Sequence, residues 1–351
     1  MKSDTTTVVD VRAVDVGYFN TKLSLGRKFI NGIPGISTLM FPSLAPRLAA
    51  GVTPTMALQK KPDGVWAEVG SAVYFVGKDS PTFISGREPR EVLPDYSTSE
   101  KYLALLRGAF HYMYQDCQAK NEMVIKHLVL GLPFGSTEER KDALIRRATG
   151  EHLLPAVGAP GSKRRITVEK TSVIYQPQGA LLAQGSSSGV FLVVDSGGGT
   201  LDWFVVNGGT SNWQRSGAYP KSMLACGHAV ADTIDPTWRD NVEIMSRIDH
   251  AIRQKASNFS VGGHVYDMAE FTNQINSVLD EAVGRMVATL GSLSDLDRVL
   301  FTGGGAHVFH DYFAACYPRL KHILVIDDDP IFANVKGFHV AGHLLDRPNA
   351  G

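Results

Sequence analysis

The residues best suited to chemistry lie in two glycine-containing turns, each between apolar, strand-like runs. The first turn reads DVGYFNTK over residues 15–22, and the second reads DSGGGTLD over residues 195–202. A glycine-rich hairpin turn lets backbone N–H groups converge on phosphate oxygens without side chains in the way. Asp15 and Asp195, at the mouths of the turns, can reach Mg²⁺ through water, because Mg²⁺ keeps several waters and takes few protein carboxylates. Lys22 would supply a point charge to a phosphate chain.

A third glycine turn, FTGGGA over residues 301–306, follows an apolar strand and precedes a helical pattern. Its glycines, Gly303, Gly304 and Gly305, permit close backbone approach to a flat group such as adenine and ribose. Taken singly, each turn is more typical of an ordinary hairpin than of a nucleotide site. The three turns in this order predict a nucleotide-binding protein.

The surrounding pattern is that of an α/β protein. Strand patterns are expected at residues 8–25 as a hairpin, and at 127–132, 166–174, 191–206, 298–302 and 323–326. Helical patterns are expected at residues 99–120, 138–149, 178–184, 242–257 and 268–290, with a last helix from about residue 330. Strand, aspartate, glycine turn and strand occur once in each half, which predicts two related domains facing each other across a cleft. The run GSSSG at residues 185–189 is a candidate boundary.

Composition limits the classes of partner. Lys plus Arg and Asp plus Glu both number 35, so the net charge is zero and gives no reason to expect direct DNA binding. No signal-peptide pattern and no long apolar run is present, so we expect a cytoplasmic protein without a membrane partner.

Five segments in order resemble the nucleotide-binding motifs of the actin, sugar-kinase and seventy-kilodalton heat-shock ATPase superfamily. They are DVGYFNTK, VIYQPQGA, VVDSGGGTLD, LFTGGGA and ANVKGF, matching phosphate 1, connect 1, phosphate 2, adenosine and connect 2. Within the superfamily, the short segments MFPSLAP and YFVGKDS and the helix after DYSTSEKY resemble the ParM/StbA proteins of plasmid segregation.

The resemblance implies an actin-like ATPase fold, with two RNase-H-like domains, a mixed five-stranded sheet in each, and a nucleotide cleft between them. Domain I would span residues 1–175, with a small inserted subdomain at about 27–100, and would be completed by the C-terminal helix at about 330–351. Domain II would span residues 176–329. The implied cofactors are ATP (or GTP) and Mg²⁺.

Site roles carry over position by position. Asp15 and Asp195 match the carboxylates that hold Mg²⁺ through water, and Gln176 matches the connect 1 residue that orients the attacking water. The matching phosphate, nucleoside and connect 2 positions are Gly17, Tyr18, Phe19, Asn20, Lys22, Gly197, Gly198, Gly199, Thr200, Gly303, Gly304, Gly305 and Gly337. Asp202 is expected either to organise its turn or to accept a proton. Tyr18 and Phe19 replace the small or hydroxyl residues of many relatives, so backbone amides would bind phosphate there.

The implied activity is slow nucleotide hydrolysis coupled to self-assembly into a head-to-tail filament that moves plasmid DNA through a DNA-bound adaptor protein. The alternative is a small-molecule (sugar-type) kinase on the same fold, although a kinase normally needs an acidic base where Gln176 stands. A chaperone or a membrane-division scaffold would need a peptide-binding domain or a membrane-targeting helix after residue 351, and we expect neither.

Overall fold

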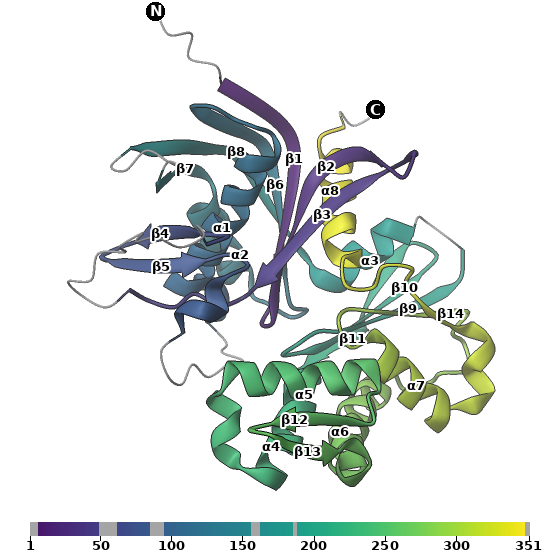
Figure 1. Ribbon diagram of the computed structural model, residues 1–351. Coiled ribbons are helices and arrows are strands. Elements are labelled where there is room, and N and C mark those ends of the chain that lie inside the picture. Colours follow the sequence, from purple (N-terminus) through teal and green to yellow (C-terminus); the bar gives the residue numbers. More distant parts are fainter. Residues whose placement is uncertain (1–5, 49–61, 85–94, 156–161, 185–187, 348–351) are drawn as a thin grey trace, which may run out of the picture.

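The computed structural model describes residues 6–48, 62–84, 95–155, 162–184 and 188–347, and Figure 1 shows their arrangement. Two sheets lie in two halves of the molecule, with helices packed around each. The expected α/β architecture with two domains is therefore confirmed. Most of the candidate boundary at residues 185–189 lies outside the described residues.

The first sheet has the strand order β3-β2-β1-β6-β8-β7. Its strands are β1 (Thr6–Val16), β2 (Asn20–Ile30), β3 (Ile33–Pro42), β6 (Glu122–Leu132), β7 (Gly150–Pro155) and β8 (Lys163–Tyr175). Central strands β1, β6 and β8 are parallel, and their apolar runs are buried, as sheets covered on both faces require. The implied five-stranded sheet is wrong here by one strand, because the edge strand β7 adds a sixth, antiparallel to β8.

The second sheet has the order β11-β10-β9-β14-β15, which repeats the order of the first five strands of the other sheet. Its strands are β9 (Val190–Ser196), β10 (Leu201–Asn207), β11 (Thr210–Tyr219), β14 (Arg298–Thr302) and β15 (Leu324–Ile326). Strands β9 and β10 form an antiparallel hairpin as β1 and β2 do, and β14 lies parallel to β9 as β6 lies parallel to β1. The repeat of strand, turn and strand predicted from the sequence is thus a repeat of topology.

Two helices cross between the sheets. Helix α3 (Gln176–Gln184) packs on the second sheet through Ala180, while α8 (Ala333–Leu345) packs on the first sheet through Val335 and Phe338. Each helix thus contacts the other, and their crossing joins the two halves (Figure 1). Helix α8 begins at Ala333, slightly later than the predicted start at about residue 330.

The other helices complete the two halves. Helix α1 (Glu100–Asp116) and α2 (Glu138–Ala148) lie with the first sheet, and α1 begins at an N-cap, Ser99, whose side chain accepts from the Tyr102 amide. A separate hairpin pairs β4 (Val65–Val69) with β5 (Ala72–Val76). Short 3₁₀ turns lie at Ser80–Phe83 and Tyr96–Thr98. The predicted lower limit of about residue 27 for an inserted subdomain is wrong, because β2 runs to Ile30 and β3 is the edge strand of the main sheet.

An outer group of elements is formed by the part of the sequence between β11 and β14. It contains α4 (Met223–Ile234), α5 (Val242–Gln254), the hairpin β12 (Asn258–Val261) and β13 (His264–Asp267), and α6 (Thr272–Leu290), with 3₁₀ turns at Pro236–Asp240 and Met268–Phe271. Helix α7 (Ala306–Cys316) and a 3₁₀ turn at Pro318–Ile323 follow β14. The sequence patterns predicted α5 and α6 but not α4 or the β12–β13 hairpin.

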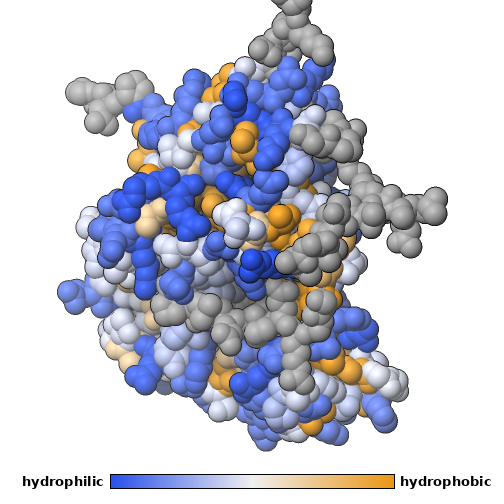
Figure 2. All heavy atoms as spheres, turned by 90° about the vertical axis from the view of Figure 1, so that its left-hand side faces the viewer, coloured by the Kyte–Doolittle hydropathy of each residue, from blue (hydrophilic) through white to orange (hydrophobic). Residues whose placement is uncertain are grey.

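Among the described residues, no helix is long and apolar enough to cross a membrane. On the face shown in Figure 2, hydrophobic residues are scattered among hydrophilic ones or gathered in small groups. The described part of this face therefore offers no broad apolar area.

Candidate functional site

The first glycine turn places a charged pair at the end of β1. Asp15 and Lys22 are directly opposite each other across the β1–β2 hairpin, and Lys22 Nζ lies 2.9 Å from Asp15 Oδ2. Asp15 is only 1% exposed. Within the turn, the Gly17 amide donates to the Asn20 carbonyl at 3.2 Å. The turn is thus closed by its own backbone, with a buried carboxylate and a cation beside it.

The second turn has the same build but a different charge. Asp195 and Asp202 are directly opposite each other across β9–β10, and the Gly197 amide donates to the Thr200 carbonyl at 3.0 Å. Asp202 therefore stands where the first hairpin carries a lysine. Its carboxylate accepts from the Phe134 amide at 2.8 Å and from the Thr200 hydroxyl at 2.5 Å, which are the contacts of a residue that organises the turn.

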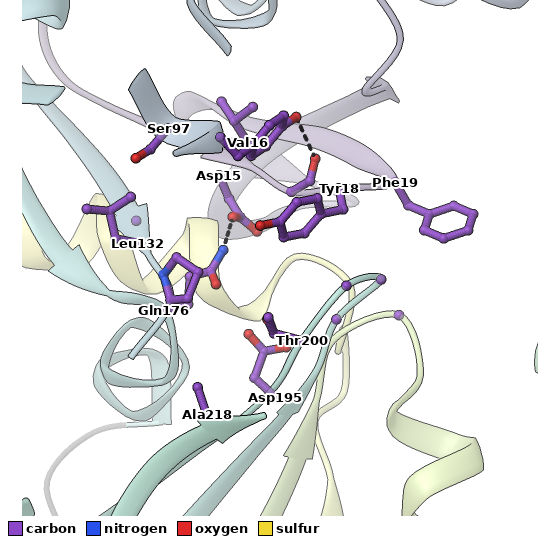
Figure 3. Close-up of a pocket in the computed structure, with 18 of the residues that line it drawn as sticks. Asp15, Val16, Tyr18, Phe19, Ser97, Leu132, Gln176, Asp195, Thr200 and Ala218 are labelled. Carbon is purple, nitrogen blue, oxygen red and sulfur yellow. Dashed lines mark hydrogen bonds between the residues drawn. The ribbon is translucent and has the colours of Figure 1, made fainter. Parts of the chain in front are cut away.

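The two turns face one cavity of about 510 Å³ between the sheets, and Figure 3 shows Asp15 and Asp195 on its opposite sides. The predicted residues that line it are Asp15, Gly17, Tyr18, Phe19, Asn20, Lys22, Gln176, Asp195, Gly197, Gly198, Gly199, Thr200 and Gly304. Segments far apart in the sequence thus form a single site.

The predicted residues Asp202, Gly303, Gly305 and Gly337 do not line the cavity. Gly303 donates to the Pro330 carbonyl and Gly305 to the Ser196 carbonyl, so their amides are used within the protein. Gly303 has φ +85°, and a Cβ there would lie 2.4 Å from Asp195 Oδ1, so only glycine fits beside that carboxylate. Of the third turn, only Gly304 is placed to contact a ligand in this cavity.

Each cavity aspartate receives an amide from one of the two crossing helices. Gln176 Nε2 donates to Asp15 Oδ1 at 2.7 Å, and Asn334 Nδ2 donates to Asp195 Oδ2 at 2.6 Å. The helices cross at Gly179 and Gly337, where a Cβ on Gly337 would lie 1.6 Å from the Gly179 carbonyl oxygen. Gly337 therefore lets α8 approach α3, which brings Asn334 to Asp195.

Burial sets the electrostatics of the site. Burial raises the pKa of Asp195 to about 6, with Lys22 partly opposing the shift. Burial, helped by the charge of Asp195, raises the pKa of Asp202 to about 7. Burial acts to lower the pKa of Lys22, but Asp15 and Asp195 together raise it above its ordinary value. When ionised, the three aspartates Asp15, Asp195 and Asp202 outnumber the single positive charge of Lys22, so a bound cation would relieve the repulsion between the carboxylates.

These residues fit a hydrated divalent ion and a phosphate chain. Asp15 and Asp195 lie on opposite sides of the cavity and would reach a hydrated Mg²⁺ through its waters, because Mg²⁺ keeps several waters and takes few protein carboxylates. Among the described residues, no group of three or more His, Cys, Asp or Glu could hold a metal ion. The glycine turns leave room at the cavity wall, since Gly197, Gly198, Gly199 and Gly304 all line it. A bound Mg²⁺ would neutralise phosphate charge.

Sequence reasoning missed several residues of the site, among them Asn334, Arg140 and Tyr96. Asn334 is 4% exposed, and its bond to Asp195 depends on the packing of α8. Arg140 and Tyr96 line the cavity from α2 and from the turn before α1. Asn334 was within the segment ANVKGF that carried the resemblance, so that motif was the available signal. Arg140 lies in none of the quoted segments, whereas Tyr96 lies in DYSTSEKY.

Ser196, next to Asp195, has a structural role. Its side chain is fully buried, and Oγ donates to the Thr302 carbonyl at 3.0 Å. The hydroxyl therefore joins the end of β9 to the end of β14, next to Asp195.

Comparison with protein families finds matches to both halves of the chain. A model of the N-terminal domain of actin-like proteins matches residues 13–179. A model of the C-terminal domain of archaeal MreB-like actin homologues matches residues 193–315. Comparison of the sequence with curated proteins gave no match.

Solved structures with the same fold cover almost the whole chain. The ADP complex of Ta0583, an archaeal actin homologue, has a TM-score of 0.66 and 19% identity, and covers 95% of this chain and 99% of its own. The apo pSK41 ParM protein has a TM-score of 0.66 and 18% identity, with coverage of 97% and 98%. The ParM of a 15-stranded filament from Clostridium botulinum has a TM-score of 0.68 and 16% identity, with coverage of 95% and 99%. The predicted fold is therefore confirmed.

Proposed function

Since the chain belongs to the actin-like proteins, we propose that it binds ATP with Mg²⁺ in the cavity between its two sheets, hydrolyses it slowly, and forms filaments. The observation that carries the proposal is the pair of buried carboxylates, Asp15 and Asp195, which two equivalent glycine turns present to one cavity. The ADP complex of the archaeal homologue, which has the same fold, supports nucleotide as the ligand.

The residues have distinct roles in this proposal. Gly17, Lys22, Gly198, Gly199 and Thr200 would hold the phosphate chain. Asp15 and Asp195 would bind the waters of Mg²⁺.

Gln176 is placed to orient an attacking water. Its amide nitrogen donates to Asp15, so its side-chain oxygen remains available to accept from a water on the cavity side. Orienting a water is a main contribution that a protein makes to phosphoryl transfer. A glutamine at this position suits hydrolysis by water, whereas a kinase acting on an alcohol would be served better by a carboxylate.

Hydrolysis would be coupled to assembly by the crossing of α3 and α8. Both helices place an amide on a cavity aspartate, and both pack against a sheet, so a change at the phosphates can alter the angle between the two halves. A head-to-tail contact that does not close on itself then produces a filament. The 15-stranded filament of the ParM from Clostridium botulinum supports self-assembly. We further propose that the filament moves plasmid DNA through a DNA-bound adaptor protein.

The test is sedimentation and light scattering at tens of micromolar protein with ATP, ADP or no nucleotide, followed by electron microscopy. We expect polymer with ATP and its loss as phosphate is released. Absence of polymer in all three conditions would refute the filament role. Release of ADP that depends on an added sugar or other alcohol would instead favour the kinase.

A further inference from the structure

Among the residues that the structure describes, the cations that line the cavity are Lys22, Arg140 and Arg253. Lys22 pairs with Asp15, and Arg253 pairs with Asp249 at 2.7 Å. The side chain of Arg140 has no hydrogen-bond or ion-pair partner in the part of the chain that the structure describes. A guanidinium in a cavity is costly to leave without an anion, because its donors lose water as the site fills.

The position of Arg140 in α2 does not explain why this residue is positively charged, because a cation there does not stabilise the helix. It lies in the first helical turn, where its amide donates to the N-cap Thr137 at 3.3 Å. Acidic residues suit a first turn, and Glu138 and Glu139 are there, whereas a positive charge opposes the helix dipole. Lys141, not Arg140, pairs with Glu138. A residue that breaks a local rule inside a cavity points to a functional role.

Tyr18 links Arg140 to the rest of the site. Figure 3 shows the Tyr18 ring turned into the cavity on the side of Asp15 and Gln176. The ring is stacked on Tyr96, with centroids 4.8 Å apart, which restrains its position. Burial raises the pKa of Tyr18 to about 12, with the charge of Asp202 adding to the shift and that of Arg140 opposing it. The phenol thus keeps its proton at neutral pH, and Arg140, which lines the same cavity, acts on it through its charge.

Arg140 therefore lines the same cavity as Gln176, and its charge acts on Tyr18, whose ring lies on the side of Asp15 and Gln176. Resting on the proposed function, we propose that Arg140 is a further catalytic residue, whose guanidinium contacts the terminal phosphoryl group of the bound nucleoside triphosphate. A planar guanidinium can donate two parallel hydrogen bonds to phosphate oxygens, and it stabilises the charge that these oxygens carry in the transition state.

The step that Arg140 assists is hydrolysis. A water oxygen forms a bond to the terminal phosphorus, and the bond from that phosphorus to its bridging oxygen breaks, with the electron pair going to the nucleoside diphosphate. One water proton leaves to solvent, and inorganic phosphate departs. Arg140 takes no proton, because a guanidinium stays charged throughout.

The experiment compares wild type with Arg140→Gln, Arg140→Lys and the control Arg146→Gln, which changes an exposed arginine of the same helix outside the cavity. Affinities for ADP, for ATP and for ADP with aluminium fluoride are measured at equilibrium, and phosphate release is measured in a single turnover. For Arg140→Gln we expect ADP affinity within about twofold of wild type and a turnover about 100-fold to 1,000-fold slower. Affinity for ADP with aluminium fluoride should fall far more than affinity for ADP alone.

Arg140→Lys should recover part of the rate, since it keeps a point charge without the planar pair of donors. Thermal unfolding checks that each variant is folded. An Arg140→Gln protein with wild-type turnover and wild-type aluminium fluoride binding would overturn this role alone. An equal loss of ADP and ATP affinity would also overturn it, by placing Arg140 at the diphosphate or the nucleoside. A wild-type protein that binds neither nucleotide would overturn the proposed function itself.

Discussion

The β1–β2 and β9–β10 hairpins have the same backbone but opposite charge at one position. Each has an aspartate at the end of its first strand, a turn closed by a glycine amide, and a residue directly opposite the aspartate, which is Lys22 in the first hairpin and Asp202 in the second. Asp15 is therefore neutralised by its own hairpin, whereas Asp195 is next to a second carboxylate. The difference teaches that the two glycine turns share a backbone shape, whereas the charge of the site is balanced only when the two halves are taken together.

The side-chain amides of the two crossing helices are likewise equivalent in position but differ in what they can do. Gln176 and Gly179 on α3 stand in the same spacing as Asn334 and Gly337 on α8, and each amide bonds the aspartate of the hairpin in the other half. Yet Gln176 lines the cavity, and Asn334 is buried outside it. The first amide is thus placed to act on a ligand, while the second can only position a carboxylate.

The largest expected effect comes from removing one aspartate from each hairpin. Asp195→Ala should reduce Mg²⁺-dependent ATP turnover by about 100-fold or more with little change in the melting temperature, because removing a buried carboxylate of raised pKa offsets the loss of its hydrogen bond from Asn334. Asp15→Ala should reduce turnover similarly but also cost about 1–3 kcal/mol of stability, since Lys22 loses its partner. Phosphate release and thermal unfolding measure the two effects.

The control for this pair is Asp142→Ala, an exposed carboxylate on α2, which should change neither quantity. Unchanged turnover in Asp195→Ala would show that Asp195 takes no part in hydrolysis and that the two hairpins do not have equivalent roles.

An intermediate effect is expected from the two helix amides. Gln176→Ala should retain nucleotide affinity and slow hydrolysis by about 10-fold to 100-fold, because a water is no longer oriented. Asn334→Ala should act through Asp195, whose pKa the Asn334 hydrogen bond lowers. Losing that bond raises the pKa further, so the acidic limb of the rate profile should move to higher pH by about half a unit.

Turnover between pH 5.5 and 8, with nucleotide affinity measured in parallel, distinguishes these roles. Identical pH profiles for wild type and Asn334→Ala would show that this amide does not control Asp195. A shifted profile in Gln176→Ala would show that the two amides do not differ as their positions indicate.

The smallest effect concerns Asp202, which stands in the second hairpin at the position that Lys22 has in the first. Burial raises the pKa of Asp202 to about 7, so the folded protein binds a proton more tightly than the unfolded chain does. Stability from this group is therefore lost as pH rises from about 4 to about 7. Without metal or nucleotide, Asp202→Asn should be more stable than wild type by about 1–3 kcal/mol at pH 8 and equal to it near pH 4.

Urea unfolding at several pH values measures this difference. A constant difference between the two proteins across the range would mean that Asp202 does not titrate within the fold.

Several features of the site followed from local sequence. The hairpins at residues 8–25 and 191–206 were predicted because alternation of apolar residues around a glycine turn depends only on neighbours in the chain. Asp15, Lys22 and Asp195 were singled out for the same reason, and the structure brings all three to one cavity. Helix α4 was not predicted, and neither was β7.

The sequence alone determined that this chain has two equivalent strand–turn–strand units with acidic residues at their mouths, and through its motifs it indicated an actin-like protein. Only the tertiary structure decided which residues reach those acids from elsewhere. Asn334 meets Asp195 because α8 packs tightly on α3 at paired glycines, and Arg140 enters the cavity because α2 follows the end of β6. Local patterns fix elements, but contacts between distant segments arise from packing, which no neighbouring residue specifies.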